Sequence, residues 1–366
     1  MHHPRLGVQL ELIPWGHYRE RLMEALQQKH SPVQGLFVPG HIWLPELADA
    51  GQLAEITPLM KALPSSVITT YDPEDIVPEI ASECCYRGAQ YQLPFFSDGH
   101  LLFYRKDLLS FDTDNGVPIV STKTIPKLAQ NIHSPPHTYG IALKADVSEI
   151  FTDFLPYLWE NGGEILDAEG QPNFDHPANI EALERYCSLK EFCPPKTEHY
   201  GNEAIEQSLR NGEAALVANW GGQTAPIMLD PENAWRDQYR TALFPIPWNA
   251  TWGIAIPANQ SKALQQSMLE ALLQLLQPAL DKQITRAAGS PVRTSSYAQD
   301  QIEQYPWLSA QREMLRRARL LPDHPKLGSC LGSLYEAVHQ AFTRDTSAQE
   351  ALQSLQHQCA KSWRAS

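Results

Sequence analysis

The sequence predicts an α/β protein of two domains, with the chain passing between the domains more than once. Its 366 residues exceed one ordinary hydrophobic core, and 43% of them are apolar while 19% are charged, as in folded globular proteins. Strands alternate with helices along most of the chain, which favours α/β layers with a mainly parallel sheet. Strands around residues 91–109 and 248–252 are interrupted by polar residues or by Pro and Trp, and we interpret both stretches as crossings between domains.

Hydrophobic periodicity predicts the elements of the first part of the chain. Strands are expected at residues 7–13 and 35–39, and helices at 17–28 and 44–50. Gly51 follows the second of these helices, and glycine favours the left-handed backbone of a helix C-cap.

The stretch of residues 91–109 is the one around which the rest of the chain is arranged. An apolar, aromatic strand (91–96) is expected to stop at a polar break (97–99) and to resume as a second strand (101–104). Such a break lets a chain leave one sheet and enter another. Asp98 would then face a cleft between the domains.

The later part of the chain shows the same alternation of strands and helices. Asp175 is placed to cap a helix with Pro177 at an early position, and the chain from residue 281 onward is mostly helical. The expected strands lie at 139–143, 214–219, 243–247 and 251–257, and the expected helices at 149–161, 178–191, 203–211 and 261–276.

Composition excludes several classes of protein. The net charge is −13, without a run of Lys or Arg that could follow a phosphate backbone, so a nucleic acid partner is not expected. No window reaches the ~20 apolar residues of a membrane span, and the N-terminus lacks the apolar segment of a signal peptide. The six cysteines are expected to be reduced, structural thiols, because a chain of this size needs no disulfide and no zinc-type spacing occurs.

Catalytic motifs are missing from the sequence. Nucleophile elbows, phosphate loops, dinucleotide fingerprints and metalloprotease motifs do not occur, so we expect neither an enzyme nor a cofactor or metal. A glycoside hydrolase would need a second carboxylate paired with Asp98, and the sequence nominates none.

Aromatic residues at strand ends, beside polar groups, are the main functional signal. Sugars stack their C–H faces on aromatic rings and pair their hydroxyl groups with carboxylates and amides. Each ring could instead simply pack in the hydrophobic core. We expect Trp159 to be a core residue, whereas the position of Trp220 beside two glycines indicates a binding site. The aromatic residues in question are Trp43, Tyr91, Phe95, Phe96, Trp159, Trp220, Trp248 and Trp252.

Three further residues carry alternatives that the sequence leaves open. Asp98 is either a turn former or a ligand-binding carboxylate. His41 is either a loop histidine or a hydrogen-bond donor to a ligand. Arg293 is either a surface charge or an anchor beside a hinge.

Seven stretches, in order and over nearly the whole chain, make the sequence similar to extracellular solute-binding proteins of the maltose and oligosaccharide class, the receptor subunits of ABC sugar importers. The ordered set is specific although no single stretch is diagnostic. The stretches are IPWGHYRERLMEAL, WLPELADAGQLAEIT, YQLPFFSDGHLLFYRKDLL, LWENGGEILDAEGQPNFDHP, EQSLRNGEAALVANW, TWGIAIPANQSK and AAGSPVRTSSY.

The resemblance implies a two-lobe fold of the type II periplasmic-binding class, with lobes that close on a sugar about hinge segments. The N-lobe would comprise residues 1–98 and 253–291, and the C-lobe residues 99–252 and 292–366. The protein would act as a monomer, without catalysis, and a membrane permease would read the closed form.

The resemblance also implies which residues bind the ligand. Asp98 would bond solute hydroxyl groups, the loop with His41 and Trp43 would contribute from the N-lobe, and Trp220 would supply an aromatic surface from the C-lobe. The remaining candidates are Glu149, Trp252, Gly253 and Arg293.

One departure from the family concerns the start of the chain. Family members begin with a signal peptide and a first strand and helix, which have no counterpart here. Three explanations are open: a start site placed too late in a longer, exported protein, a decayed gene, or a shortened cytoplasmic protein that senses sugar. We favour the first, and therefore a periplasmic or extracellular location.

Overall fold

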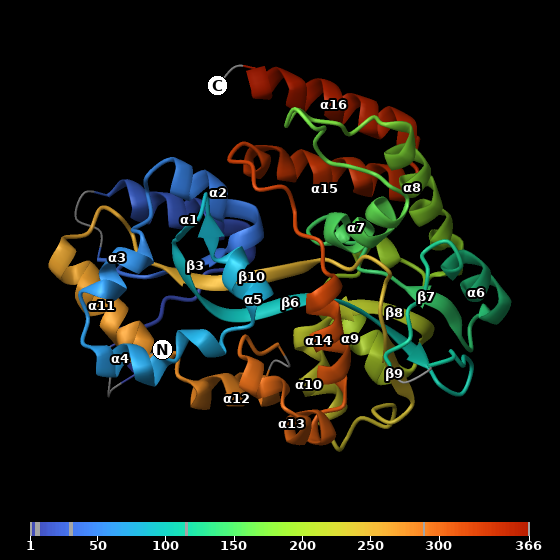
Figure 1. Cartoon of the computed structure of the whole chain (residues 1–366). Helices are drawn as coiled ribbons and strands as arrows, with labels where there is room; N and C mark the ends of the chain where they lie inside the picture. Colours follow the sequence, from blue (N-terminus) through green and yellow to red (C-terminus); the bar gives the residue numbers. More distant parts are fainter. Residues whose placement is uncertain (1, 4–7, 29–31, 114–115, 288–289, 365–366) are drawn as a thin grey trace. The chain divides into compact units, whose positions relative to one another are not determined.

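The computed structural model describes residues 2–3, 8–28, 32–113, 116–287 and 290–364, and the chain forms two compact units (Figure 1). The first unit comprises Met1–Ser97, Thr251–Gln283 and Pro291–Ser296. The second unit comprises Asp98–Ala250, Ile284–Ser290 and Tyr297–Ser366. The chain thus passes between the units several times, and each unit is described by itself below.

The first unit packs helices around a short antiparallel strand pair. Leu36–Pro39 (β3) pairs with Asn249–Ala255 (β10), and buried leucines of the flanking helices form the core with Val38. The predicted strand at residues 35–39 is confirmed, whereas only Val8–Gln9 (β2) of the strand predicted at 7–13 forms, and residue 7 lies outside the described residues. The other elements are β1 (His2–His3), α1 (Trp15–Gln27), α2 (Gly40–Asp49), α3 (Ile56–Lys61), α4 (Ser65–Tyr71), η1 (Pro73–Asp75), α5 (Pro78–Glu83), β4 (Cys85–Tyr86), β5 (Ala89–Gln90) and α11 (Lys262–Leu275).

The predicted polar break at residues 97–99 is wrong, because Gln92–Arg105 (β6) is one continuous strand. The strand passes from the first unit to the second between Ser97 and Asp98. Gly99 is required within it, since a Cβ there would lie 2.4 Å from the carbonyl oxygen of Trp248 and 2.7 Å from the Met314 sulfur. The polar residues therefore stay in an extended strand that pairs with its neighbours.

The sheet of the second unit is mixed, not mainly parallel as predicted. In that unit β6 pairs antiparallel with Ala214–Trp220 (β8) and with Tyr239–Ala242 (β9). Tyr139–Ala142 (β7) pairs in parallel with β8. The strand predicted at residues 243–247 is wrong, because Pro245 and Pro247 lack the N–H groups that a ladder needs; β9 ends before them.

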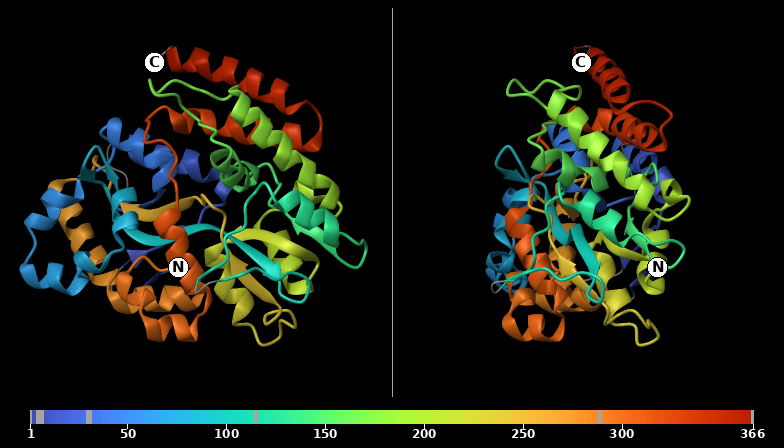
Figure 2. Two further views of the ribbon diagram at one scale, coloured as in Figure 1. Left: turned by 45° about the vertical axis from the view of Figure 1, so that its right-hand side comes forward. Right: turned by 90° about the vertical axis from the view of Figure 1, so that its right-hand side faces the viewer.

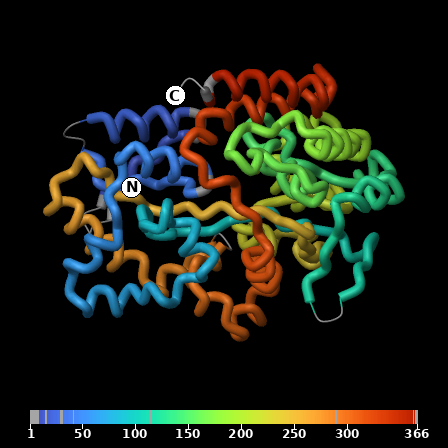
Figure 3. Tube along the Cα trace, turned by 45° about the horizontal axis from the view of Figure 1, so that its top comes forward, coloured from blue at the N-terminus to red at the C-terminus, as the bar shows by residue number. Residues whose placement is uncertain are grey.

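A group of helices packs together in the second unit. It consists of α7 (Ile150–Glu160), α8 (Pro177–Ser188), α15 (Leu327–Thr343) and α16 (Ala348–Arg364). Figures 2 and 3 show α15 and α16 side by side. The predicted cap of α8 is corrected: the His176 ring nitrogen, not Asp175, accepts a hydrogen bond from the Ala178 N–H, at 3.3 Å. Gly212, in the left-handed conformation, ends α9 (Asn202–Asn211).

The remaining elements complete the second unit or span the unit boundaries. None of the helices in the described residues is long and apolar enough to cross a membrane. The six cysteines all lie in the described part of the chain, and none of them is in a disulfide. The elements are α6 (Ile125–Ile132), η2 (Leu189–Phe192), η3 (Thr197–His199), η4 (Gly221–Gln223), α10 (Thr224–Met228), α12 (Pro278–Ala287), η5 (Thr294–Tyr297), α13 (Gln299–Gln304) and α14 (Trp307–Arg317).

Candidate functional site

Asp98 begins the second unit as a partly exposed residue of β6. Its Oδ1 accepts hydrogen bonds from the Gly222 N–H at 2.7 Å and from the Ser290 hydroxyl at 3.2 Å. Burial raises the pKa of Asp98 above its ordinary value, although the Gly222 N–H and the Lys144 ammonium favour the ionised form. Two hydrogen bonds thus hold Oδ1 of the side chain. Because the pKa is about 7, the carboxyl group gains or loses its proton near neutral pH.

Trp220 ends β8 directly opposite His100 of β6. Its indole N–H donates to Glu149 Oε2 at 3.2 Å, and the rings of His100 and Trp248 approach its ring edge-on, with centroids at 4.5 and 5.0 Å. The Lys144 Nζ lies 4.6 Å from the ring centroid. These contacts fix the orientation of the indole while leaving Trp220 partly exposed.

Glu149, which accepts the hydrogen bond of the Trp220 indole, is held in place by a second hydrogen bond. It occupies the N-cap position of α7, and its Oε1 accepts a hydrogen bond from the Asn202 side chain at 2.9 Å. Glu149 is partly exposed. Asp98, Glu149 and Trp220 therefore make one polar and aromatic site in the second unit, which we call the solute site.

A cluster of buried titratable residues adjoins the solute site. Lys144 and His100 are 0% exposed and Asp153 is 1% exposed. Asp153 Oδ2 accepts a hydrogen bond from the Tyr186 hydroxyl at 3.0 Å, and its Oδ1 lies 3.5 Å from His100 Nδ1. Burial raises the pKa of Asp153 to about 7 and lowers the pKa of His100 well below its ordinary value, so the histidine is neutral.

The first-unit candidates lie in a different setting. Trp43 is 6% exposed within the hydrophobic core and stacks on Tyr18, with ring centroids 5.9 Å apart. Trp252 is partly exposed and stacks on Phe96 at 5.9 Å. His41 belongs to α2, but its side chain lies outside the described residues.

Gly253 serves packing in β10. A Cβ at this position would lie 2.7 Å from the Gln92 side chain and 2.9 Å from the Leu93 carbonyl oxygen. Any larger residue would therefore push β10 away from β6 within the first unit.

Arg293 is buried in the first unit, with 1% of its surface exposed. Its guanidinium donates to three backbone carbonyl groups, those of Leu276 at 2.6 Å, Tyr71 at 2.7 Å and Asp72 at 2.9 Å. Asp75 lies 3.6 Å away. These contacts tie three segments together, which is a structural use of the residue.

Sequence reasoning missed most of the groups that surround Asp98 and Trp220. No sequence motif marked Lys144, Asp153 or His100, and a single charged residue is more often on a protein surface. A usable signal was the alternation along β6, where Asp98 and His100 are two residues apart and therefore share one face of the strand.

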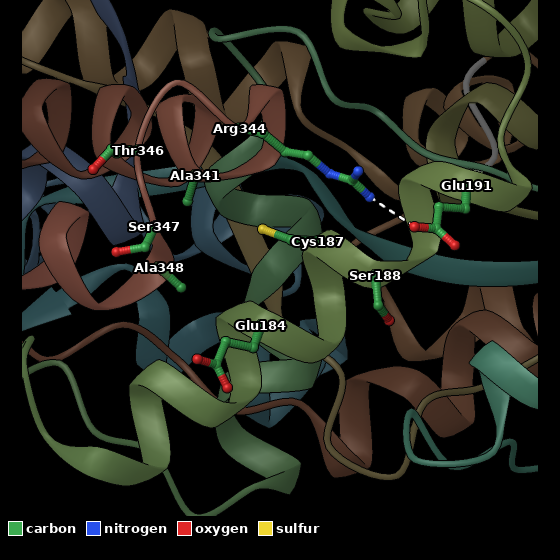
Figure 4. A pocket seen from close by; sticks show the side chains of 9 residues that line it. All are labelled: Glu184, Cys187, Ser188, Glu191, Ala341, Arg344, Thr346, Ser347 and Ala348. Atoms are coloured by element: carbon green, nitrogen blue, oxygen red, sulfur yellow. Dashed lines mark hydrogen bonds and ion pairs between the residues drawn. The ribbon is translucent and has the colours of Figure 1, made fainter.

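A pocket of about 530 Å³ lies in the second unit against α8 and the turn between α15 and α16 (Figure 4). Arg344 points to Glu191, with an ion pair of 2.9 Å. Burial raises the pKa of Cys187 to about 12, so this thiol is unreactive. The pocket shares no residue with the solute site, and no group of metal-binding side chains occurs among the described residues.

Comparison with known proteins gives a family and a fold. Residues 2–275 match the family described as bacterial extracellular solute-binding protein. The mannitol-binding protein of Pseudomonas aeruginosa is 24% identical over 337 residues, which cover 82% of this chain and 75% of that protein.

Solved structures give the same fold. An ABC transporter solute-binding protein from Agrobacterium radiobacter K84, in complex with ribitol, has a TM-score of 0.85 at 22% identity, covering 97% of this chain and 91% of that one. A solute-binding protein from Agrobacterium vitis S4 with bound D-mannitol has a TM-score of 0.79 at 20% identity, covering 95% and 89%. The predicted α/β, two-lobe solute-binding fold is confirmed.

Proposed function

The chain belongs to the family of bacterial extracellular solute-binding proteins, and from this premise we propose that it binds a small polyhydroxylated solute, a polyol or sugar, for an ABC importer. The observation that carries the proposal is the solute site, where a partly exposed indole is flanked by two partly exposed carboxylates. Such a site stacks the C–H face of a polyol and accepts hydrogen bonds from its hydroxyl groups.

The named ligands of the relatives support a polyol in particular. The relatives include a mannitol-binding protein and structures that hold ribitol or D-mannitol. We propose that the protein acts outside the cytoplasm, as a monomer, and delivers its solute to a permease. The family is one of binding proteins, and we propose no catalysis.

A thermal-shift screen tests the proposal. The screen should compare mannitol, ribitol and other alditols with maltose and with trisaccharides, and calorimetry should follow any hit. A ligand at a hundred times its dissociation constant adds ~2.7 kcal/mol of stability, so we expect an alditol to raise the melting temperature clearly. A cooperative melt that no polyol or sugar moves would contradict the proposal.

Replacing Asp98 by Asn should weaken solute binding by about 10- to 100-fold at neutral pH, since a hydrogen bond to a charged acceptor contributes ~1.5–3 kcal/mol. The measurement is calorimetry with the best alditol. Burial raises the folded-state pKa of Asp98, so ionising this carboxyl costs stability as the pH rises. Asp98→Asn removes that cost and should not lower the melting temperature at alkaline pH.

The same raised pKa predicts a pH dependence of binding in the native protein. The ionised carboxylate is a strong acceptor through both oxygens, whereas protonation turns one oxygen into a hydroxyl donor. Protonation of Asp98 begins near neutral pH rather than near the ordinary value of ~3.9. Affinity should therefore fall as the pH drops from mildly alkaline to mildly acidic. Asp98→Asn should flatten this profile; an unchanged profile in the variant would assign it to another group.

A further inference from the structure

Lys144 places an ammonium group inside the second unit without a hydrogen-bond acceptor. Its side chain is fully buried, and its Nζ has no hydrogen-bond partner among the described residues. Lys144 lies two residues after the end of β7, so its position is set by the parallel pair β7–β8. A buried charge without compensation is costly, and its retention here requires other electrostatic partners.

Those partners are an aromatic ring and three carboxylates. The Nζ lies 4.6 Å from the ring centroid of Trp220. Asp98, Glu149 and Asp153 each attract the ammonium electrostatically. Burial lowers the pKa of Lys144, and these three carboxylates oppose that shift.

The ammonium changes what the solute site can recognise. An indole ring bordered by carboxylates is the usual recognition element for an organic cation, through cation–π attraction and ion pairing. In this protein two of the three carboxylates, Asp98 and Glu149, are partly exposed at the site. The ring and the carboxylates already interact with Lys144, which is fully buried.

We infer that Lys144 is a specificity-determining residue of the solute site: its buried ammonium occupies the place of a cationic ligand and restricts the site to uncharged polyols. The inference rests on the proposed function. A solute with an amino group would bring a second positive charge to the same ring and carboxylates, and like charges in a poorly hydrated site repel. A neutral alditol meets no such repulsion.

The test uses ligands that differ in one group. Mannitol, 1-amino-1-deoxymannitol and mannonate share a carbon skeleton and carry a neutral, a cationic and an anionic end, and a ribitol series can be built in the same way. Calorimetry on the whole chain gives the ratio of affinities for the neutral and cationic members. We expect the native protein to bind the alditol with a dissociation constant at least about 10-fold lower than that of the amine.

Lys144→Met should reduce that ratio by at least about 10-fold or reverse it, whereas Lys144→Arg should retain it. Lys190→Met is the matched control, because Lys190 also lies over an aromatic ring, Phe342 at 5.4 Å, and pairs with Glu198. The ratio is diagnostic because a general loss of folding lowers both affinities together. If Lys144→Met does not fold, the preference of the native protein and of Lys144→Gln carries the test.

Each outcome decides the inference. An unchanged ratio in Lys144→Met, with the alditol still bound, would overturn the inference and leave the proposed function intact. Equal or tighter binding of the amine by the native protein would also overturn the inference, as would preferred binding of mannonate, which would make Lys144 an anchor for an anionic ligand. Failure of the native protein to bind any member of either series would overturn the inference, and if no sugar of the thermal-shift screen bound either, the proposed function would fall with it.

Discussion

Arg293→Met is expected to lower the free energy of unfolding by about 3–5 kcal/mol, the largest loss of stability that we predict for a single substitution. The variant removes the arginine donors from the carbonyl groups of the buried Tyr71 and Leu276. The carbonyl of Asp72 loses the same donor but keeps the Asp75 N–H. The variant also removes the positive partner of Asp75. Methionine fills a similar volume, so the loss reports the missing donors more than a cavity.

Urea denaturation followed by circular dichroism measures this loss. Arg236→Met is the control, since Arg236 is partly exposed and forms its ion pair with an exposed neighbour, Asp237; its effect should stay within about 0.5 kcal/mol. The sequence left Arg293 open between a surface charge and an anchor. If Arg293→Met kept its stability and lost affinity for the solute, the arginine would be a ligand-binding residue and the structural assignment would be wrong.

The fold was predictable where local signals agree with tertiary pairing. Gly51 was expected to follow a helix in the left-handed conformation, and it does so, as does Gly212. Ser261 caps α11, where its hydroxyl oxygen accepts a hydrogen bond from the Leu264 N–H at 3.3 Å. In these places a few adjacent residues decide the backbone, so sequence alone is sufficient.

The predictions failed where pairing between distant segments overrides local preference. Ser97, Asp98 and Gly99 look like a turn, but the ladder with β8, which begins at His100, keeps β6 extended. The mixed sheet is a similar case, since the direction of β6 relative to β8 depends on residues more than one hundred positions apart. Local sequence patterns do not indicate which distant segments will pair, or in which direction.

The solute site was predictable only in part, for the same reason. Asp98 and Trp220 were candidates from their own sequence context, and Glu149 came from the resemblance to a family. The structure brings all three together in the second unit. The roles of Lys144 and Asp153 can be recognised only after the fold has brought the segments around residues 98, 144 and 220 together. A buried ammonium cannot be told from a surface lysine before that convergence is known.

Trp220→Ala is expected to cause the largest loss of solute affinity, about 30- to 1,000-fold, which corresponds to ~2–4 kcal/mol. The indole supplies the stacking surface of the proposed site, and its N–H holds Glu149 in place. Calorimetry with the best alditol measures the loss, and Trp220→Phe should fall between the native protein and the alanine variant because it keeps a ring but lacks the N–H donor.

Trp235→Ala is the matched control for this experiment. Trp235 is also a partly exposed tryptophan of the second unit, and a cation, Arg105, lies 4.6 Å from its ring centroid, as Lys144 lies from that of Trp220. Both alanine variants should therefore lose comparable stability, while only Trp220→Ala should lose affinity. If Trp220→Ala melted at a much lower temperature but bound the solute as tightly as the native chain, the ring would be a packing residue, and the stacking surface of the site would have to be sought elsewhere.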